Sequence, residues 1–325
     1  MPVTRRDVIV TAALSAAFLA PLAQAQGNWP DKPVRFVVPY APGGTTDYAA
    51  RQVAQRLTEQ LGKSFFVENR AGASGTIGTT QVVKSPADGS TFLVNDTTYS
   101  MLPALFKKLP WDHGNDLIPV TTLATTPVVM VVPESSPYKT LQDLLAFARK
   151  NPGKVNYGSG GAGSSTHLAG EVLRDKAGLA LVHIPYKGAG EAMLGVMSGQ
   201  VDVLITASPT AMGPVKGGKV RALAVSGSKR VAALPGVPTF AEAGVKGYDV
   251  TNWFGLAAPK GTSPEIVSRL QAAVRKAVND PALKARLEEQ GAVPGGISPT
   301  EFSTLIQREN AAWSAVAKAA GVKAD

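Results

Sequence analysis

The 325-residue chain contains no cysteine. This absence excludes a disulfide framework, a thiolate zinc site, a cysteine nucleophile and a lipid-modified N-terminal cysteine. Runs of one charge are also lacking. The formal net charge is +9, but the Lys and Arg residues are scattered, and no basic stripe with interleaved aromatic residues suggests nucleic-acid binding. We therefore expect no nucleic-acid partner, whereas a general attraction for small anions is compatible with this charge.

Long apolar runs are rare, and the longest lies near the N-terminus. Arg5 and Arg6 precede an apolar stretch over residues 8–22, and Ala23-Gln24-Ala25 has the small-x-small pattern of a signal-peptidase site. The stretch is too short and too rich in alanine for a membrane span. These features predict a signal peptide over residues 1–25, cleaved after Ala25, and a periplasmic protein. Paired arginines occur in Sec and twin-arginine signals, so both export routes stay open.

The mature chain alternates apolar runs with helical patterns, which predicts an α/β fold with parallel strands. Its opening stretch, residues 34–51, reads as a strand, a Gly43-Gly44 turn and a helix from about Thr46 to Leu61. Asp47 falls in the first turn, where a carboxylate suits the positive end of the helix dipole. The free N–H groups of such a turn can bind an anion, although the same pattern also suits an ordinary βα turn.

The order of the predicted elements suggests two halves. Further strands are expected over residues 65–68, 91–94, 127–133, 155–157, 181–185, 201–206, 220–225 and 250–259, with helices between several of them. Three closing helices have clear start signals at Ser263-Pro264, Asp280-Pro281 and the Ser298/Glu301 capping box. We expect these helices to pack on the first half, with the chain crossing between halves near 120–132 and 250–258.

A glycine motif in the second half raises the question of a dinucleotide cofactor. Gly158, Gly160 and Gly163 match G-x-G-x-x-G between a strand and a helix. The next strand, however, is followed by Tyr186-Lys187-Gly188, without the acidic residue that would hold a ribose. We therefore expect no cofactor, and no metal site either, because the three histidines are far apart in the sequence and lack HExxH spacing.

Hydrolytic or isomerase chemistry is the main enzymatic alternative. His167 follows Ser164 and Ser165 in the glycine-rich loop, so a histidine–serine pair has to be considered. No G-x-S-x-G motif or orienting acid accompanies it. A local hydrogen bond or a ligand contact is the favoured role for His167, and no catalytic residue is assigned.

The same combination of residue types occurs in both halves of the chain. The segments PGGTTD, GASGT and GAGSSTH each combine small residues, hydroxyl groups and the start of a helix. Two helix N-termini that face each other across a cleft would offer N–H donors to an anion with two acidic ends. The pattern predicts a recognition site without a catalyst.

Four long stretches then carry a resemblance that covers essentially the whole mature chain. They are WPDKPVRFVVPYAPGGTTDYAAR, VENRAGASGTIGTTQVVKSPADGSTFLV, NPGKVNYGSGGAGSSTHLAGE and HIPYKGAGEAMLGVMSGQVDV. In this order they resemble the Bug family, the TctC-type periplasmic solute-binding components of tripartite tricarboxylate transporters. Ser90 in ADGSTFLV departs from the larger residue, often Tyr, that the family carries, and we expect it to alter packing instead of binding.

The resemblance implies a two-lobed, type II periplasmic-binding-protein fold with two crossings and a ligand cleft between the lobes. Lobe 1 would comprise residues 26–122 plus 255–325, and lobe 2 residues 123–254. The protein would be a monomeric receptor and not an enzyme. It would pass a small carboxylate to membrane transporter subunits. Dicarboxylates, tricarboxylates, aromatic acids and acidic amino acids all remain open as ligands, and a periplasmic sensor subunit would use the same pocket.

The resemblance also implies the binding residues. The family's carboxylate-binding loops correspond to residues 40–47 and 163–167 here, and neighbouring strand ends add further walls. Asp47 either caps its helix or takes the ammonium of an amino-acid ligand, and Tyr40 and Tyr186 would provide a face for an aromatic acid. The predicted ligand-binding residues are Tyr40, Gly43, Gly44, Thr45, Asp47, Ser74, Thr98, Gly163, Ser164, Ser165, Thr166, His167, Tyr186 and Ala207.

Overall fold

A computed structural model describes residues 29–323, so the predicted signal peptide lies outside the described residues. The strands, in chain order, are β1 (Val34–Val38), β2 (Phe65–Asn69), β3 (Thr91–Asp96), β4 (Leu117–Pro133), β5 (Val155–Ser159), β6 (Leu181–Pro185), β7 (Val203–Ala207), β8 (Val220–Val225), β9 (Thr251–Pro259) and β10 (Val293–Pro294). The helices are α2 (Thr45–Leu61), α3 (Thr76–Val83), α4 (Thr97–Leu105), α5 (Leu141–Lys150), α6 (Ser165–Ala177), α7 (Ala189–Met197), α8 (Ser208–Lys216), α9 (Pro264–Val278), α10 (Pro281–Glu289) and α11 (Pro299–Ala320), with a short 3-10 turn, η1 (Ala73–Gly75).

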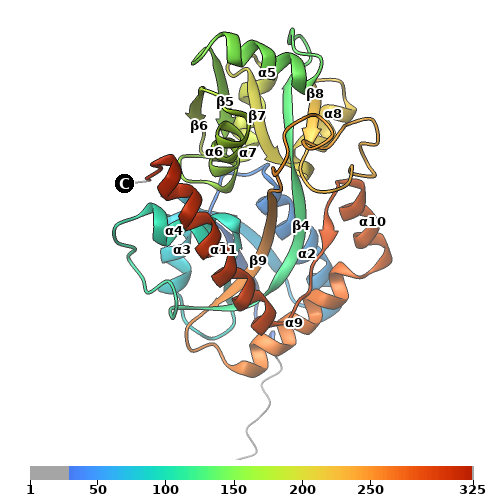
Figure 1. The fold of residues 1–325 in the computed structure, drawn as a ribbon. Helices are drawn as coiled ribbons and strands as arrows, with labels where there is room; N and C mark the ends of the chain where they lie inside the picture. Colours follow the sequence, from blue (N-terminus) through green and yellow to red (C-terminus); the bar gives the residue numbers. More distant parts are fainter. Residues whose placement is uncertain (1–28, 324–325) are drawn as a thin grey trace, which may run out of the picture.

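The strands form two α/β lobes, one above the other in Figure 1. Their order is β2-β1-β3-β9-β4-β7-β5-β6, and β8 and β10 also pair with β4. The first lobe holds the parallel group β2-β1-β3, and the second holds the parallel group β7-β5-β6. Strand β9 runs antiparallel to both of its neighbours, β3 and β4. We use lobe 1 for the elements around β1–β3 and β9, and lobe 2 for those around β5–β8.

Strand β4 joins the two lobes. Its first part, residues 117–127, pairs with β9, and its last part, residues 128–133, pairs with β7 and β8. The chain returns to lobe 1 at Thr251, where β9 begins. The predicted two-crossing architecture is thus observed. The boundaries at 122/123 and 254/255 remain a proposal. Residues 251–254, which that division assigns to lobe 2, pair with β3 and β4.

Helices cover both faces of each sheet. In lobe 1, α2 and α9 bury Leu57 and Leu270 against one face, and α3, α4 and α11 cover the other face. In lobe 2, α5 and α6 cover one face, and α7 and α8 cover the other. Burial of a Leu side chain contributes about 1.5–3 kcal/mol, so these layers stabilise each sheet. The helices cover the faces of the sheets, and the carboxyl ends of the parallel strands carry the connecting loops.

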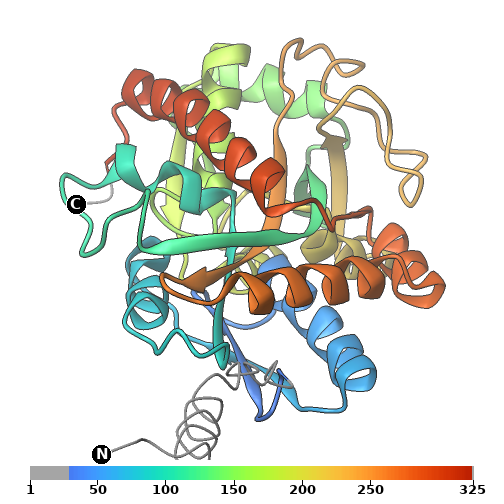
Figure 2. The ribbon, with the colours of Figure 1, turned by 90° about the horizontal axis from the view of Figure 1, so that it is seen from below.

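Helix α11 spans the two lobes. It packs on α4 and β4 of lobe 1 and continues to α6 of lobe 2. Figure 1 shows its oblique course across the front, and Figure 2 shows it in red across the molecule, with α9 alongside β4. The prediction that the closing helices pack on the first half is confirmed for α9, α10 and α11, and the contact of α11 with lobe 2 is additional.

Two helices, α4 and α8, were not predicted from the sequence. Helix α4 begins directly after β3, where Asp96 caps it by accepting a hydrogen bond from the N–H of Thr98, and it contains Pro103. Helix α8 begins directly after β7 and contains Pro214. A polar or proline-containing run after a strand resembles a loop, because proline disfavours a helix interior. No helix among residues 29–323 is long and apolar enough to cross a membrane.

Candidate functional site

A cavity of about 40 Å³ lies between the lobes. Nine of the predicted residues line it: Tyr40, Gly44, Thr45, Asp47, Thr98, Ser164, Ser165, Thr166 and Ala207. Ala41 and Thr46, which lie within the predicted loop of residues 40–47, also line it. Six further residues complete the wall: Asp96, Gly160, Ala189, Thr206, Asn252 and Phe254. The wall thus combines the ends of strands with the starts of the helices that follow them.

Five helices present their N-terminal ends to this cavity. The lining residues at these ends are Gly44 of α2, Asp96 of α4, Ser164 of α6, Ala189 of α7 and Ala207 of α8. The first N–H groups of a helix lack intrahelical partners, and the dipole makes this end favourable for an anion. No Lys or Arg side chain is among the lining residues. The site can therefore recognise an anion through backbone N–H groups and hydroxyl groups.

Asp47 holds the first loop in place. Its carboxylate accepts hydrogen bonds from the N–H of Gly43 at 3.2 Å, from Nε of Arg51 at 3.0 Å and from Nδ2 of Asn69 at 3.0 Å. Burial alone would raise the pKa of Asp47, but these hydrogen bonds lower it overall. Both carboxylate oxygens are engaged, and Gly43 has a φ of +87° that favours glycine. Asp47 is therefore built into the loop itself.

Asp96 is a second carboxylate at the cavity, and it was not among the predicted ligand-binding residues. It accepts hydrogen bonds from the hydroxyls of Tyr40 at 2.9 Å and Thr46 at 3.0 Å, and from the N–H of Thr98 at 2.9 Å. Burial raises its pKa. Its position as the first residue before α4 explains this role, since Asp is a preferred N-cap. Asp96 fixes the side chains of the lobe 1 wall.

The second loop is held by its own hydroxyl groups. Oγ1 of Thr166 accepts a hydrogen bond from the N–H of Gly160 at 2.9 Å and lies 3.1 Å from Oγ of Ser164. Oγ of Ser164 also caps α6 by accepting from the N–H of His167. These bonds aim the start of α6 at the cavity.

His167 stabilises this loop through a hydrogen bond to its backbone. Its Nδ1 accepts a hydrogen bond from the N–H of Gly163 at 3.0 Å, and its Nε2 lies 3.7 Å from Glu171. The ring stacks on His183 with centroids 3.7 Å apart. Burial lowers the pKa of His167, so the ring is neutral near pH 7. Both ring nitrogens face partners other than the serines of the loop, which is the local-hydrogen-bond role that the sequence favoured.

The lobes touch at the rim of the cavity. Oγ1 of Thr45 lies 2.9 Å from Oγ1 of Thr210, and the N–H of Ser165 donates to Oγ1 of Thr98 at 3.1 Å. A cavity of about 40 Å³ has room for roughly one water molecule, whose share of liquid volume is about 30 Å³. A carboxylic acid of several carbons is much larger. Such a molecule does not fit in a cavity of this size.

Glycines permit this close approach. A Cβ atom added at Gly190 in α7 would lie 2.8 Å from the carbonyl oxygen of Pro42 and 2.9 Å from the carbonyl carbon of Gly43. A Cβ added at Gly188 would lie 3.3 Å from the Cβ of Ala41. The start of α7 in lobe 2 therefore packs directly on the first loop of lobe 1.

The other predicted residues lie around the cavity. Oγ of Ser74 donates to the carbonyl of Ala162 in lobe 2 at 2.6 Å, at an exposed position. Gly43 and Gly163 donate to Asp47 and His167. Tyr186 packs over Gly195, where an added Cβ would lie 2.2 Å from its hydroxyl oxygen, and it lines an outer hollow instead of the interlobe cavity.

Two buried polar atoms lie in the cavity wall. Oγ1 of Thr206 and Oδ1 of Asn252 have no hydrogen-bond partner within residues 29–323, and their residues are 0% and 2% exposed. Buried polar groups usually have a partner, so both are candidates to contact a ligand. Neither residue is among the predicted ligand-binding residues, because the sequences of β7 and β9 are those of apolar core strands. Phe254, two residues after Asn252, adds an apolar surface.

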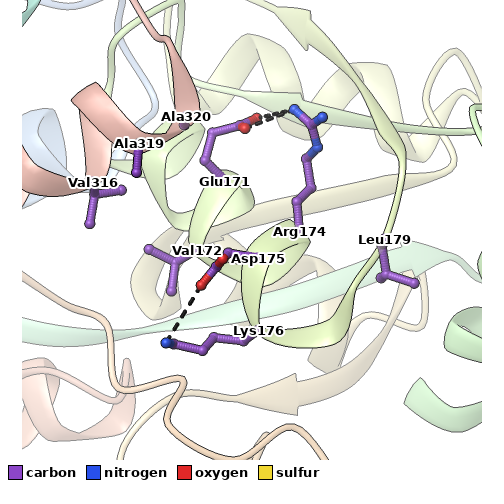
Figure 3. Close-up of a pocket in the computed structure, with 9 residues that line it drawn as sticks. All are labelled: Glu171, Val172, Arg174, Asp175, Lys176, Leu179, Val316, Ala319 and Ala320. Carbon is purple, nitrogen blue, oxygen red and sulfur yellow. Dashed lines mark hydrogen bonds and ion pairs between the residues drawn. The ribbon is translucent and has the colours of Figure 1, made fainter.

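A larger hollow of about 450 Å³ lies between α6 and the end of α11 (Figure 3). Its charged groups pair with each other. Arg174 lies 2.7 Å from Glu171, and Lys176 lies 3.5 Å from Asp175. No group of three or more His, Asp or Glu residues in the described part of the chain could hold a metal ion. The interlobe cavity is therefore the stronger candidate for anion binding.

Comparisons with known proteins agree with this geometry. Residues 49–322 match the model of the tripartite tricarboxylate transporter family receptor, TctC. The protein BugT of Bordetella pertussis is 33% identical over 325 residues, covering 99% of each chain. The structure of Rhodopseudomonas palustris Rpa4515 with adipate is 37% identical, with a TM-score of 0.88 over 91% of this chain and 99% of that one.

MatC from Rhodopseudomonas palustris, solved with bound malate, is a further structural relative. It is 32% identical, with a TM-score of 0.82 over 89% of this chain and 99% of that one. The family consists of substrate-binding proteins and not of enzymes, which removes the hydrolase or isomerase alternative for His167. The family model covers most of the chain, and the structural relatives share the two-lobed fold. The chain therefore belongs to the TctC family of tripartite tricarboxylate transporter receptors, the Bug-type solute-binding proteins.

Proposed function

We propose that this protein is a periplasmic receptor that captures a small carboxylate between its lobes, with a dicarboxylate as the first candidate. The observation that carries the proposal is the convergence of five helix N-termini on one interlobe cavity without a Lys or Arg side chain. Two structural relatives were solved with adipate and malate, which are both dicarboxylates. The anion-binding features of this chain support the same class of ligand.

Each of the two loops, residues 40–47 and 163–167, would bind one end of the ligand. One carboxylate would lie against the start of α2 at Gly44 and Thr45, and the other against the start of α6 at Ser165. The hydroxyl of Thr206 and the amide of Asn252 would contact polar groups between the two ends. Ligand binding would favour the closed arrangement, because only there do both loops contact the same molecule.

Export and delivery complete the proposal. The predicted signal peptide would be cleaved after Ala25, and the mature monomer would carry its ligand to the membrane subunits of a tripartite tricarboxylate transporter. Membership of a transporter-receptor family supports delivery to such subunits. A closed receptor differs in shape from an open one, which gives the membrane subunits a means to select the loaded form.

The direct test is a ligand panel on residues 26–325, refolded to remove co-purified solutes. Thermal shifts would be measured with adipate, malate, citrate, benzoate and glutamate. A ligand at about a hundred times its Kd stabilises the folded state by about 2.7 kcal/mol, which raises the Tm by several degrees. We expect the largest shift from a dicarboxylate. The absence of a shift with every acid would overturn the proposal.

Thr98→Val sharpens this test. It removes the hydroxyl that accepts the N–H of Ser165 across the cleft while keeping the side-chain shape. Loss of one hydrogen bond costs about 1 kcal/mol, so affinity should fall about fivefold or more. Thr304→Val, which removes an exposed hydroxyl on α11, is the matched control. Equal affinity of both variants would contradict a site at this cavity.

A further inference from the structure

A second cavity, of about 250 Å³, lies within lobe 1 and shares no lining residue with the interlobe cavity. It is enclosed by β3, the start of β4, β9, α4, α11 and the loop over residues 106–116. We call it the α4–α11 cavity. Its volume equals that of roughly eight water molecules, at about 30 Å³ each, which is enough for a small organic molecule.

The wall of this cavity includes buried polar side chains without partners. Asn95 is 2% exposed, and neither its Nδ2 nor its Oδ1 has a hydrogen-bond partner within the described residues. Both ring nitrogens of His113 are also buried and unpartnered within the same part of the chain. A buried carboxamide that makes no hydrogen bond costs about 1–3 kcal/mol, so a partner from outside the chain is expected.

Asn95 lies beside apolar side chains on one face of β3. Leu93, two residues earlier, shares this face and packs with Leu117 and Ile306 in one hydrophobic cluster. Leu117 and Ile306 also line the cavity. An amide in this place weakens the core unless something pairs with it. Its position therefore indicates a recognition group instead of a packing residue.

The residues that line the α4–α11 cavity favour an uncharged ligand over an ion. No Asp, Glu, Lys or Arg lines the cavity. Burial lowers the pKa of His113 to about 4, so this ring is neutral near pH 7. Tyr99 stacks on the His113 ring with centroids 4.2 Å apart. Asp112, the residue before His113, acts electrostatically on this ring. The α4–α11 cavity thus differs in kind from the anion site between the lobes.

We propose that the α4–α11 cavity is a second binding site, which takes a small uncharged molecule with a hydrogen-bond donor and acceptor on one edge, such as a carboxamide or a lactam. The carboxamide of Asn95 pairs with that edge through two parallel hydrogen bonds. The imidazole of His113 contacts the far end of the molecule. The apolar side chains of Leu117 and Ile306 cover its flanks.

This site lies on elements that also reach the interlobe cleft. Asn95 precedes Asp96, which caps α4 at the cleft, and α4 carries both Thr98 and Tyr99. Helix α11 supplies Ser303 and Asn310 to the cavity wall and continues to α6 of lobe 2. A molecule in the α4–α11 cavity therefore contacts both helices that connect it to the carboxylate site.

Nicotinamide is a suitable probe, because it is uncharged and carries a carboxamide on a small ring. We would titrate residues 26–325 with nicotinamide and follow the amide resonances by NMR, with nicotinate as the charged counterpart. The expected result is saturable shifts in residues 106–116 and 303–310 with nicotinamide and none there with nicotinate, which as a carboxylate is expected at the interlobe cavity instead. Shifts that do not saturate, or equal shifts with nicotinate, would overturn the proposal.

Two variants locate the binding. Asn95→Leu replaces the unpaired amide with an apolar group of similar size, and Ser303→Leu fills the cavity from α11 while leaving Asn95 in place. Each should weaken nicotinamide binding at least tenfold, whereas the exposed Thr304→Val should not change it. A correctly folded variant keeps the carboxylate-induced thermal shift of the wild type. If both folded variants bind nicotinamide as the wild type does, the cavity is not the site.

Discussion

Asp47 and Asp96 both lie beside the interlobe cavity, but their carboxylates have different partners. Asp47 pairs with Arg51 and holds the N–H of Gly43, whereas Asp96 holds the hydroxyls of the lobe 1 wall. The sequence places Asp47 correctly in the first turn of a helix. It does not reveal that Arg51, one turn later, and a residue of β2 occupy its oxygens, because those contacts depend on the fold.

Asp47→Ala tests whether this carboxylate is structural. The change removes the acceptor of the Gly43 N–H, one of the two hydrogen bonds that Nδ2 of Asn69 donates, and the ion-pair partner of Arg51, so the free energy of unfolding should fall by about 1–3 kcal/mol. Affinities for glutarate and glutamate should fall by the same factor. Chemical denaturation and calorimetric titration measure both effects, with the exposed Asp175→Ala as the control. A loss confined to glutamate, at unchanged stability, would instead assign Asp47 to the ligand's ammonium.

The stacked pair of His167 and His183 makes stability depend on pH. Burial lowers the pKa of His183 to about 3, and the neighbouring His167 acts in the same direction. The unfolded chain titrates near 6.5. Between a pH of about 3 and 6.5, His183 is protonated in the unfolded state but not in the folded state. The free energy of unfolding therefore decreases as the pH falls below about 6.5.

His183→Gln should reduce this dependence while keeping a polar group near Oγ of Ser159, which lies 2.6 Å from Nε2 of the histidine. Urea denaturation at pH 7 and pH 5 would measure it. The wild type should lose more stability than the variant over this interval, with a difference in slope of up to about 1.4 kcal/mol per pH unit. The same slope in both proteins would show that His183 already carries its proton in the folded state at pH 5.

At the scale of elements, local signals identified helix starts better than strand partners. The capping box of Ser298 and Glu301 begins α11 as predicted, and Ser263-Pro264 and Asp280-Pro281 begin α9 and α10. These signals are local, since a cap bonds to its own first turn. The antiparallel insertion of β9 between β3 and β4 is non-local, and no feature of its own residues specifies it. Asn252 and Phe254 reach the cavity through this insertion.

The contact between α7 and the first loop of lobe 1 gives an element-scale prediction. In Gly190→Ala the new Cβ would meet the carbonyl of Pro42 at 2.8 Å, so the lobes could not close fully. Alanine also favours a helix over glycine by about 1 kcal/mol, so the stability of the ligand-free protein should not fall. We expect at least a tenfold loss of carboxylate affinity in a calorimetric titration.

Gly213→Ala in α8 is the matched control, because a Cβ atom added at Gly213 has no neighbour within 4 Å. It should bind carboxylate as the wild type does. If Gly190→Ala also binds with wild-type affinity, the contact between α7 and residues 41–44 is not needed for closure.

At the scale of the whole molecule, the two-lobed arrangement follows from three connections. Strand β4 runs from one sheet into the other, β9 brings the chain back, and α11 contacts both lobes. The sequence predicted the two crossings, because the closing helices have no strands of their own and were expected to pack back on the first half. It did not predict how tightly the lobes approach, since the cavity of about 40 Å³ depends on loop contacts between residues far apart in the chain.

The central claim is that a carboxylate binds between lobes that open and close, and an interlobe distance tests it most directly. The chain has no cysteine, so Lys84→Cys and Lys154→Cys place spin labels at two exposed positions, one on each lobe, without further changes. Pulsed electron resonance would measure their separation with and without the carboxylate that gives the largest thermal shift. The account predicts a longer, broader distance distribution without ligand and a shorter, narrower one at saturation. An unchanged distribution at saturating ligand would contradict it.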